Sequence, residues 1–549
     1  MKKFKFTDAD IKQIQVRGQT VATITNQLER FEKGPRSVQL VHAATVDQGI
    51  KKISSLDSKS LVNTFESAAH QGRVTSFIPA SGAATRMFKG LTSVLLSPQK
   101  PSLKDLEDAA QKQDAGNEDA KELLEWWDGI KRGVFPFHLL LVLKLYENNL
   151  DLNELIAQQN YRPVLETLLT NSGLHFSDLP KALIPFHFEE DGPRLSLEVH
   201  LRENSQLVTD ENGKCKLHFT VSPEHEQFFR EQLDWIQKKI AAASSSVKPF
   251  QFEIKLSHQK PETDTIAVDE NNQPIRNVQN EIVFRPGGHG ALLKNLEATQ
   301  ADILFIKNID NVVTDIAREK VILFRKVMGG YLIEIQNQIF YFIKQIDSQS
   351  DSAQLQSALS LSADIQKFLS DYFGLALSSN QFSLSALKNI LHRPLRVCAM
   401  VKNQGEPGGG PFWVKGLTTL AGAAAAAETD GKVSLQIVES SQVDKSSSEQ
   451  KNIFISSTHF NPVDMVCGLK NVYDENFNLE EFVDHESYFI TTKSFNGKTI
   501  KALELPGLWN GSMAYWNTIF IEAPVDIFNP VKTVNDLLRP SHQTIYNRV

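Results

Sequence analysis

A run of small residues, Pro79-Ala80-Ser81-Gly82-Ala83-Ala84-Thr85-Arg86, contains the first side chains whose types and spacing suggest chemistry. The apolar run 74–78 before it is typical of a buried strand, and helix-forming residues follow at 87–96. In α/β proteins a strand, a small-residue loop and a helix hold phosphate, because backbone N–H groups can approach the phosphate oxygens. Arg86 would add a planar cation. Because the loop lacks both the P-loop ending and a three-glycine fingerprint, a plain strand–turn–helix connection is the alternative interpretation.

One carboxylate and two lysines are further candidates for phosphate chemistry. Asp310 follows the apolar run 302–306, so it lies at the C-terminal end of a predicted strand, where open α/β sheets bind ligands. We assign Asp310 to Mg²⁺ and phosphate, with a carboxylate that caps the next helix as the alternative. Lys181 precedes another predicted strand, so its amine could reach a triphosphate. A surface lysine with its stem along apolar residues is the alternative for Lys181 and for Lys532.

A glycine-rich segment at 286–290 and two later carboxylates are candidates for binding the rest of a substrate. His289 lies between Gly288 and Gly290, and glycine-rich loops expose the side chains that they carry, so we expect His289 to contact ligand. Glu439 and Glu504 each close an apolar run and could bind sugar hydroxyls. For Glu504 a solvated carboxylate is the favoured interpretation.

Three other features have a structural alternative. His459 and His485 are interpreted as structural histidines. The segment 406–410, which is rich in glycine and proline, is either a lid on the sugar side or a tight connection.

The elements that must position these residues alternate between helical and strand patterns. Helical spacing is predicted at 7–70, 91–179 and 315–393, and the middle segment is interpreted as a helical insertion. Strands are predicted at 181–187, 216–221, 250–255, 302–306, 397–401, 435–438, 453–455 and 518–521. Strands that alternate with helices predict an α/β fold with a mostly parallel, helix-covered sheet.

The same patterns predict four successive parts of the chain. They are an N-terminal helical segment at 1–70, a first part of the α/β core at 71–345 with the insertion at 91–179, a helical connector at 346–394, and a second part of the core at 395–549.

Composition excludes several classes of function. With 549 residues, of which 41% are hydrophobic, the chain can bury a large core. A net charge of -7 argues against nucleic acid as a partner, because phosphate backbones require a basic face. The three cysteines, Cys215, Cys398 and Cys467, are far apart and odd in number, so neither a disulfide framework nor a zinc knuckle is suggested. No signal peptide or membrane-spanning stretch is apparent, so a cytoplasmic protein without a membrane partner is expected.

Six segments in the same order resemble the motifs of the UDP-sugar pyrophosphorylase superfamily of uridylyltransferases. They resemble its small-residue loop, its Pro-Lys-x-Leu signature, its Pro-Gly-His-Gly nucleotide loop, its Asn-x-Asp-Asn strand end, its apolar–Glu–x–x–Gln–Val segment and its Val-Lys-Thr-x-x-Asp-Leu close. In this sequence they are 79–87, 180–185, 286–290, 308–311, 435–443 and 531–537.

The whole chain more closely resembles the bacterial domain of unknown function 4301 family. The segments that fit this family are 405–413, 460–464 and 505–512. That family supplies no activity, so the expected activity comes from the superfamily. Ser81 and Ala84 stand where the superfamily usually has glycine, and the insertion between Met87 and Pro180 is also atypical of it.

The resemblance implies a glycosyltransferase-A-like α/β fold and a Mg²⁺-dependent nucleotidyltransferase. Its substrates would be a nucleoside triphosphate, with UTP as the first candidate, and a sugar 1-phosphate. The implied catalytic residues are Arg86, Lys181 and Lys532, with Asp310 for the metal. The implied binding residues are Ala80, Ser81, Gly82, Ala83, Thr85, Gly288, His289, Gly290, Asn308, Glu439 and Glu504.

Two alternatives stay open. A glycosyltransferase on the same fold would be expected to carry an Asp-x-Asp metal motif, and Asp8-Ala9-Asp10 lies far from any predicted strand end. A non-catalytic protein that binds or senses nucleotide sugars is favoured by Ser81 and Ala84 and opposed by Arg86, Lys181, Asp310 and Lys532.

Overall fold

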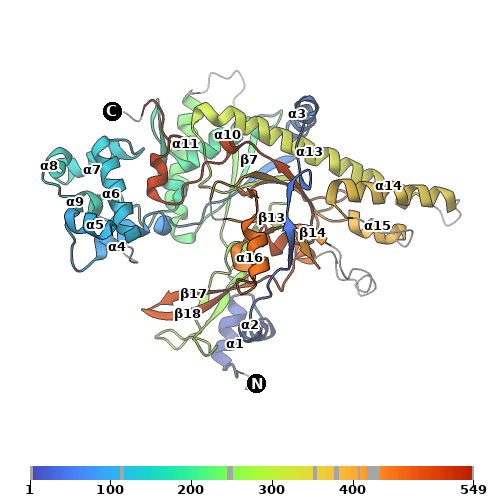
Figure 1. The fold of residues 1–549 in the computed structure, drawn as a ribbon, viewed down its shortest axis with the longest axis horizontal. Helices are drawn as coiled ribbons and strands as arrows, with labels where there is room; N and C mark the ends of the chain where they lie inside the picture. The colour runs from blue at the N-terminus through green and yellow to red at the C-terminus, as the bar shows by residue number, and fades with distance from the viewer. Residues whose placement is uncertain are drawn as a thin grey trace. The chain divides into compact units, whose positions relative to one another are not determined.

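The computed structural model describes residues 4–111, 117–243, 251–349, 355–375, 383–405, 408–416 and 433–546 (Figure 1). The chain forms two compact units, and each unit combines segments that are distant in sequence. The first contains Met1–Phe77, Ser257–Ile306 and Lys326–Ala523, and the second contains Ile78–Leu256, Lys307–Arg325 and Pro524–Val549. The predicted division into four successive parts stays a prediction.

The first unit is built on a mostly parallel sheet. Its strands run in the order β2 (Thr45–Val46), β3 (Gly49–Lys51), β19 (Asn517–Glu522), β12 (Leu395–Lys402), β16 (Asp464–Gly468), β11 (Ile303–Lys307) and β4 (Val74–Pro79). β12 pairs in parallel with β19 and antiparallel with β16, and Ile303 to Ile306 of β11 pair in parallel with Val74 to Phe77 of β4. Seven of the eight residues of β12 are buried, as expected for a strand covered on both faces. The mixed α/β class with a mostly parallel sheet is therefore confirmed.

Helices and two smaller sheets complete the first unit. Phe65 of α3 (Ser55–His70) packs edge-on against Phe305 of β11, with ring centroids 5.7 Å apart. A four-stranded sheet runs in the order β10 (Phe284–Arg285), β9 (Thr265–Val268), β18 (Lys498–Glu504) and β17 (Phe489–Phe495). It shares a core with α1 (Asp8–Val16) and α2 (Val21–Lys33). A three-stranded sheet joins β1 (Leu40–Ala43), β13 (Gly410–Lys415) and β14 (Val433–Val438).

The expectation that 7–70 is helical throughout is wrong between Leu40 and Lys51. Three short strands, β1 to β3, occupy this stretch and belong to two different sheets. Its apolar residues are mostly β-branched or alternate with polar ones, a pattern that fits pleated, half-buried surface better than a helix face.

The second unit contains the predicted helical insertion and the strand–loop elements beside it. Its helices are α4 (Lys89–Leu96), α5 (Leu103–Ala110), α6 (Asn117–Arg132), α7 (His138–Glu147), α8 (Leu152–Ala157), α9 (Arg162–Leu169), α10 (Ser196–Leu207) and α11 (Glu226–Ala243). Between residues 91 and 179 the described residues form helices and turns but no strand, in agreement with the helical spacing. Trp126 and Trp127 of α6 are buried in one apolar core with Val531 and Leu537, which ties the insertion to the C-terminal segment.

The second unit also contains strands. They are β5 (Pro185–Glu189), β6 (Gly192–Leu195), β7 (Lys214–Thr220) and β8 (Gln251–Ser257). The predicted strand at 181–187 is wrong in its first part, because Lys181–Leu183 form a 3₁₀ turn before β5 begins.

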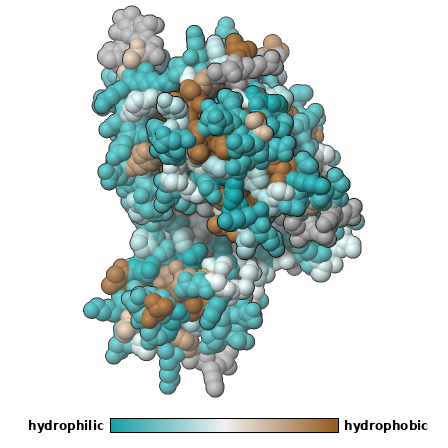
Figure 2. Space-filling model, turned by 90° about the vertical axis from the view of Figure 1, so that its left-hand side faces the viewer, coloured by the Kyte–Doolittle hydropathy of each residue, from teal (hydrophilic) through white to brown (hydrophobic). Residues whose placement is uncertain are grey.

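The face of the molecule in Figure 2 is predominantly polar, and apolar residues occur on it in small groups. In the part of the chain that the structure describes, no helix combines the length and the apolar character that a membrane crossing requires.

Candidate functional site

Asp310, Lys181 and Lys532 form a compact charged group in the second unit. The ammonium of Lys181 donates to Oδ2 of Asp310 at 2.8 Å and to the carbonyl oxygen of Val531 at 2.6 Å. Nζ of Lys532 lies 3.5 Å from the same carboxylate oxygen. The side chain of Lys532 is 50% exposed, whereas those of Lys181 and Asp310 are each 12% exposed. Lys532 is therefore the cation of this group that a ligand can reach.

Backbone pairing places Asp310 next to the C-terminal segment. The N–H of Val531 donates to the carbonyl of Asp310 at 3.0 Å, and Asn311 forms an antiparallel bridge with Pro530. The N–H groups of Lys532 and Thr533 both donate to Oδ2 of Asp536, at 2.6 and 2.7 Å. Asp536 thus fixes the backbone that presents Lys532.

A buried network holds the strand end that carries Asp310. The carbonyl oxygen of Ile309 accepts hydrogen bonds from the hydroxyl of Ser196 and from Nε2 of His200. Lys307 at the end of β11 and Arg325 both bind the carboxylate of Glu203, at 2.7 and 2.6 Å, and all three side chains are almost completely buried. Because these charges compensate one another, they fix the end of β11 without leaving an isolated buried charge.

The pKa values in the charged group follow from burial and pairing. Burial acts to raise the pKa of Asp310, but the ammonium groups of Lys181 and Lys532 outweigh it and hold that pKa below its usual value. Burial lowers the pKa of Lys181, and the Asp310 carboxylate opposes part of this shift. Asp310 is therefore an anion throughout the neutral range.

The small-residue loop adjoins this group through Lys181. The loop is anchored because Ala80 N–H donates to Thr220, Ala84 N–H donates to Leu179, and the carbonyl of Gly82 accepts from Lys181 N–H. The N–H groups of Ser81, Gly82 and Ala83 make no hydrogen bond to any described residue. Three consecutive backbone donors without partners are suited to binding an anion.

Beyond these donors the loop differs in part from the phosphate loop that the sequence predicts. Ala84–Arg86 form a single 3₁₀ turn, and α4 begins only at Lys89. Thr85 and Arg86 are exposed, and Arg86 has no ion pair among the described residues. Its guanidinium is therefore free to meet a ligand.

Oxygen ligands for a metal are few around Asp310. In the described residues no group of three or more His, Cys, Asp or Glu side chains is arranged to hold a metal ion. Oδ1 of Asp310 makes no hydrogen bond to a described residue, whereas Oδ2 is shared by two lysines. One free carboxylate oxygen fits Mg²⁺, which commonly takes one protein carboxylate together with substrate phosphates and water.

His289 and Trp509 form a stacked pair in the first unit. Their ring centroids are 4.2 Å apart at an interplanar angle of 16°. The backbone N–H of Leu508 donates to Nδ1 of His289 at 3.0 Å, so the ring proton of a neutral His289 is on Nε2. Burial lowers the pKa of His289, although Glu439 and Glu504 act in the opposite direction. Nε2–H of a neutral imidazole is thus available as a donor.

Glycines make this stack possible. A Cβ on Gly507 would lie 2.7 Å from Cε1 of His289, and one on Gly290 would lie 2.0 Å from the carbonyl oxygen of Pro506. Gly288 has φ +77°, which favours glycine, and a Cβ there would lie 3.0 Å from Oε2 of Glu504. The segment 286–290 therefore fits closely against 504–507.

The two predicted sugar-binding carboxylates belong to the same unit as this stack. Trp509 Nε1–H donates to Oε1 of Glu439 at 3.2 Å. Glu504 accepts from the hydroxyl of Thr491 at 3.2 Å and from Nζ of Lys493 at 2.9 Å. The interpretation of Glu504 as a solvated carboxylate is therefore wrong, because it is partly buried and ion-paired.

The remaining predicted residues lie as follows. Asn308 is partly buried at the end of β11 and its side chain has no partner among the described residues. His459 is buried and bonds to the hydroxyl of Thr458. His485 is exposed, with Nε2 3.7 Å from Glu480. Of the segment 406–410, Glu406 and Pro407 lie outside the described residues.

The sequence reasoning assigned no role to Trp509 and Asp536, although both contact predicted residues. The segment 505–512 places an aromatic residue among glycine and proline residues, and that is the signal that could have identified Trp509. Asp536 is the acidic residue of the motif at 531–537, and Thr533-x-x-Asp536 matches a capping box, so either pattern could have identified it.

Solved structures with a similar arrangement are UDP-sugar pyrophosphorylases. The enzyme for UDP-N-acetylglucosamine from Trypanosoma brucei is 14% identical, with 97% of this chain and 82% of that chain covered and a TM-score of 0.40. The UDP-glucose pyrophosphorylase of Leishmania major is 13% identical, with 97% and 79% covered and a TM-score of 0.38. Identities and TM-scores this low carry no functional argument.

Comparison by sequence identifies the family. Among curated proteins none matches this chain. The family model described as "Domain of unknown function (DUF4301)" matches residues 7–543. The chain therefore belongs to the DUF4301 family.

Proposed function

We propose that the protein is a nucleotidyltransferase that joins a nucleoside triphosphate to a sugar 1-phosphate and releases pyrophosphate. UTP is the first candidate for the nucleoside triphosphate. The observation that carries this proposal is the group around Asp310 in the second unit. It combines an accessible ammonium on Lys532 with the free N–H groups of Ser81, Gly82 and Ala83 and the free guanidinium of Arg86. Such fixed donors are what a transferring phosphoryl group requires.

The proposed reaction needs positioning and charge neutralisation rather than a covalent intermediate. An oxygen of the sugar phosphate attacks the α-phosphorus of the triphosphate, a new P–O bond forms, and the bond to pyrophosphate breaks. Lys532, Arg86 and the loop N–H groups hold the phosphate oxygens while charge shifts to the leaving group. Mg²⁺, held by Oδ1 of Asp310, would supply positive charge on the phosphates when bound.

The group around His289 in the first unit is suited to a sugar. Trp509 offers an aromatic face, Glu439 accepts hydroxyl donors, and the neutral imidazole of His289 donates from Nε2. Carbohydrates present both an apolar C–H face and hydroxyl groups, so this combination supports a carbohydrate as the ligand of this group.

The Asp-x-Asp triplet that a glycosyltransferase would use for a metal has a structural role in this protein. Asp10 of the triplet Asp8-Ala9-Asp10 caps α1 and pairs with Arg276 at 2.8 Å, so it holds the N-terminal helix in place. Its hydrogen bond from Arg276 lowers the pKa of Asp10 to about 2.

The second candidate function is binding of a nucleotide sugar without turnover. Ala84 favours it, because its N–H is used by the carbonyl of Leu179 and cannot reach a phosphate. The experiment that separates the two measures pyrophosphate release from each nucleoside triphosphate with a panel of sugar 1-phosphates, with and without Mg²⁺. Release with at least one pair supports the transferase, and tight binding of a UDP-sugar without release by any pair supports the binding protein.

A further inference from the structure

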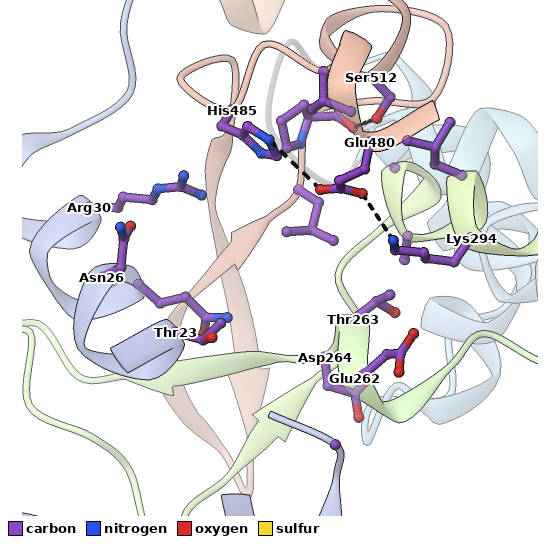
Figure 3. Close-up of a pocket in the computed structure, with 18 of the residues that line it drawn as sticks. Thr23, Asn26, Arg30, Glu262, Thr263, Asp264, Lys294, Glu480, His485 and Ser512 are labelled. Carbon is purple, nitrogen blue, oxygen red and sulfur yellow. Dashed lines mark hydrogen bonds and ion pairs between the residues drawn. The ribbon is translucent and has the colours of Figure 1, made fainter. Parts of the chain in front are cut away.

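A cavity in the first unit lies beside the segments that surround His289, with Gly290, Leu505 and Pro506 in its wall. Its volume is about 670 Å³, within the range of small-molecule sites. Its wall is formed by Gly18 and α2, the turn at 262–264, residues 290–294, residues 480–485 and residues 505–512. Figure 3 shows Arg30 and Lys294 pointing into the cavity from opposite sides.

Several charged groups of the wall already have partners. Asp264 is bound by Nη1 of Arg17 at 2.6 Å. Glu480 lies 3.4 Å from Nζ of Lys294 and 3.7 Å from Nε2 of His485 (Figure 3). The opposite charges within these pairs neutralise each other, so these groups do not require a charged ligand.

Two polar side chains of α2 have no such partner. Arg30 has no hydrogen bond or ion pair from its guanidinium to a described residue, although it interacts electrostatically with the carboxylate of Glu486, and its Nε is buried without a partner. The ring of Tyr488, 5.0 Å from the guanidinium carbon, holds Arg30 in place. Asn26, one helical turn earlier, is likewise unpartnered among the described residues. A fixed guanidinium with an amide beside it is suited to a carboxylate.

A carboxylate without a partner comes from a different segment of the wall. Glu262 is exposed and its side chain makes no hydrogen bond or ion pair with the residues that the structure describes. The unpaired carboxylate of Glu262 disfavours a second negative charge on the ligand. An ammonium group on the ligand would instead pair with Glu262.

We propose that this cavity binds a small zwitterion, an amino acid or a dipeptide, with its carboxylate on Arg30 and Asn26 and its ammonium on Glu262. This site goes beyond the proposed function, because none of its charged residues belongs to the groups around Asp310 or His289.

The cavity shares a wall with the segment that positions His289. Gly290 and Pro506 line the cavity, and their backbones touch each other. The hydroxyl of Ser512 donates to the carbonyl of Pro506 at 2.6 Å, and Gly507 lies against the ring of His289. A ligand in the cavity therefore contacts the residues that set the position of His289, which makes the site suited to an effector.

The test is calorimetric titration of the full chain with the twenty amino acids and their glycyl dipeptides. At least one is expected to bind with a Kd below about 1 mM, since charge-assisted hydrogen bonds at both ends supply most of the affinity. The 2-hydroxy acid and the decarboxylated amine that correspond to this ligand are each expected to bind at least about tenfold more weakly.

Variants locate the site. Arg30→Gln and Glu262→Gln are each expected to weaken binding about tenfold or more, whereas Glu29→Gln, on the same helix and exposed, leaves it unchanged. Because Arg30→Gln also removes the contact with Tyr488, Asn26→Ala at the exposed position is the second variant and is expected to weaken binding several-fold.

Three outcomes would overturn the proposal. They are no binding by any member of the panel, equal binding of the hydroxy acid, and binding that Glu262→Gln and Asn26→Ala leave unchanged. The readout is heat of binding, so failure of the proposed nucleotidyl transfer would leave this test unaffected.

Discussion

The ammonium of Lys181 lies 2.8 Å from Oδ2 of Asp310 and also donates to the carbonyl of Val531. Through these two bonds, Lys181 joins the end of β11 to the C-terminal segment. Lys532, which lies 3.5 Å from the same oxygen and is half exposed, is the cation left for a ligand. The two lysines therefore have different roles, although the sequence assigns both to catalysis.

Lys532→Ala is expected to reduce turnover by about 10²–10³ while leaving the free energy of unfolding almost unchanged. Removal of one fixed electrostatic group typically has this effect on rate, and an exposed ion pair contributes little to stability. Steady-state kinetics and urea denaturation measure the two quantities. The matched control is Lys320→Ala, an exposed lysine of the same unit that pairs with Asp526 at 2.9 Å. Equal losses of turnover in both variants would contradict the role of Lys532.

Lys181→Met is expected to lower the free energy of unfolding by about 3 kcal/mol, because it leaves the buried Asp310 carboxylate with the more distant Lys532 alone. Urea denaturation at pH 7 measures this change. The double variant Lys181→Met with Asp310→Asn is expected to regain part of the loss, since the uncompensated charge is then absent. A double variant as unstable as the sum of the two single variants would refute the pairing.

Three buried histidines of the second unit make stability depend on pH. Burial lowers the pKa of His200 and of His542 to about 3, and it lowers the pKa of His187 well below its usual value. An unfolded histidine has a pKa of about 6.5, so between these values the unfolded state binds more protons. The free energy of unfolding should therefore fall as the pH decreases below about 6.5, by up to about 1.4 kcal/mol per pH unit for each histidine.

Denaturation in urea at pH 7.5, 6.5 and 5.5 measures this slope. His200→Gln, which retains a donor for the carbonyl of Ile309, should reduce the slope by up to about 1.4 kcal/mol per pH unit. A slope that this variant leaves unchanged would show that His200 is protonated equally in both states.

Trp509→Ala is expected to weaken the binding of a UDP-sugar about three- to tenfold, because the aromatic face and the hydrogen bond to Glu439 are both lost. Calorimetric titration with UDP-glucose and UDP-N-acetylglucosamine measures the change. Trp235→Ala, at a half-exposed position on α11, is the control and should bind as the wild type does. Unchanged binding in Trp509→Ala would show that the stack of His289 and Trp509 does not contribute to binding of the UDP-sugar.

Much of the sheet could be predicted from the sequence because its strands are continuous apolar runs. The eight residues of β12 and the five of β11 are almost entirely buried, so their composition alone identifies them. The apolar run 453–455 was predicted as a strand and is wrong, since it ends helix α16 (Ser448–Ile455). The hydroxyl of Ser447 caps this helix by accepting from Gln450 N–H. A short apolar run does not distinguish the two structures.

The residues around Asp310 could be predicted individually, but their pairing could not. Asp310 was identified because it follows a predicted strand. Lys181 and Lys532 were identified by the resemblance to the UDP-sugar pyrophosphorylase superfamily. The ion pair with Lys181 joins residues 129 positions apart, and no local pattern encodes such a contact. Trp509 was missed for the same reason, because its partners are distant in sequence, whereas Asp536 lies in a local Thr-x-x-Asp pattern that could have identified it.

The most direct test of the central claim is the reverse reaction, conversion of a UDP-sugar and pyrophosphate to UTP and a sugar 1-phosphate. The full chain, with Mg²⁺, is assayed for UTP formation from a panel of UDP-sugars, and binding of each is measured in parallel. The proposed activity predicts that UTP forms from at least one UDP-sugar. Asp310→Asn and Lys532→Ala should each reduce the rate of this reaction by about 10²–10³, while binding of the UDP-sugar changes less. Tight binding of a UDP-sugar with no UTP formed from any member of the panel would contradict it.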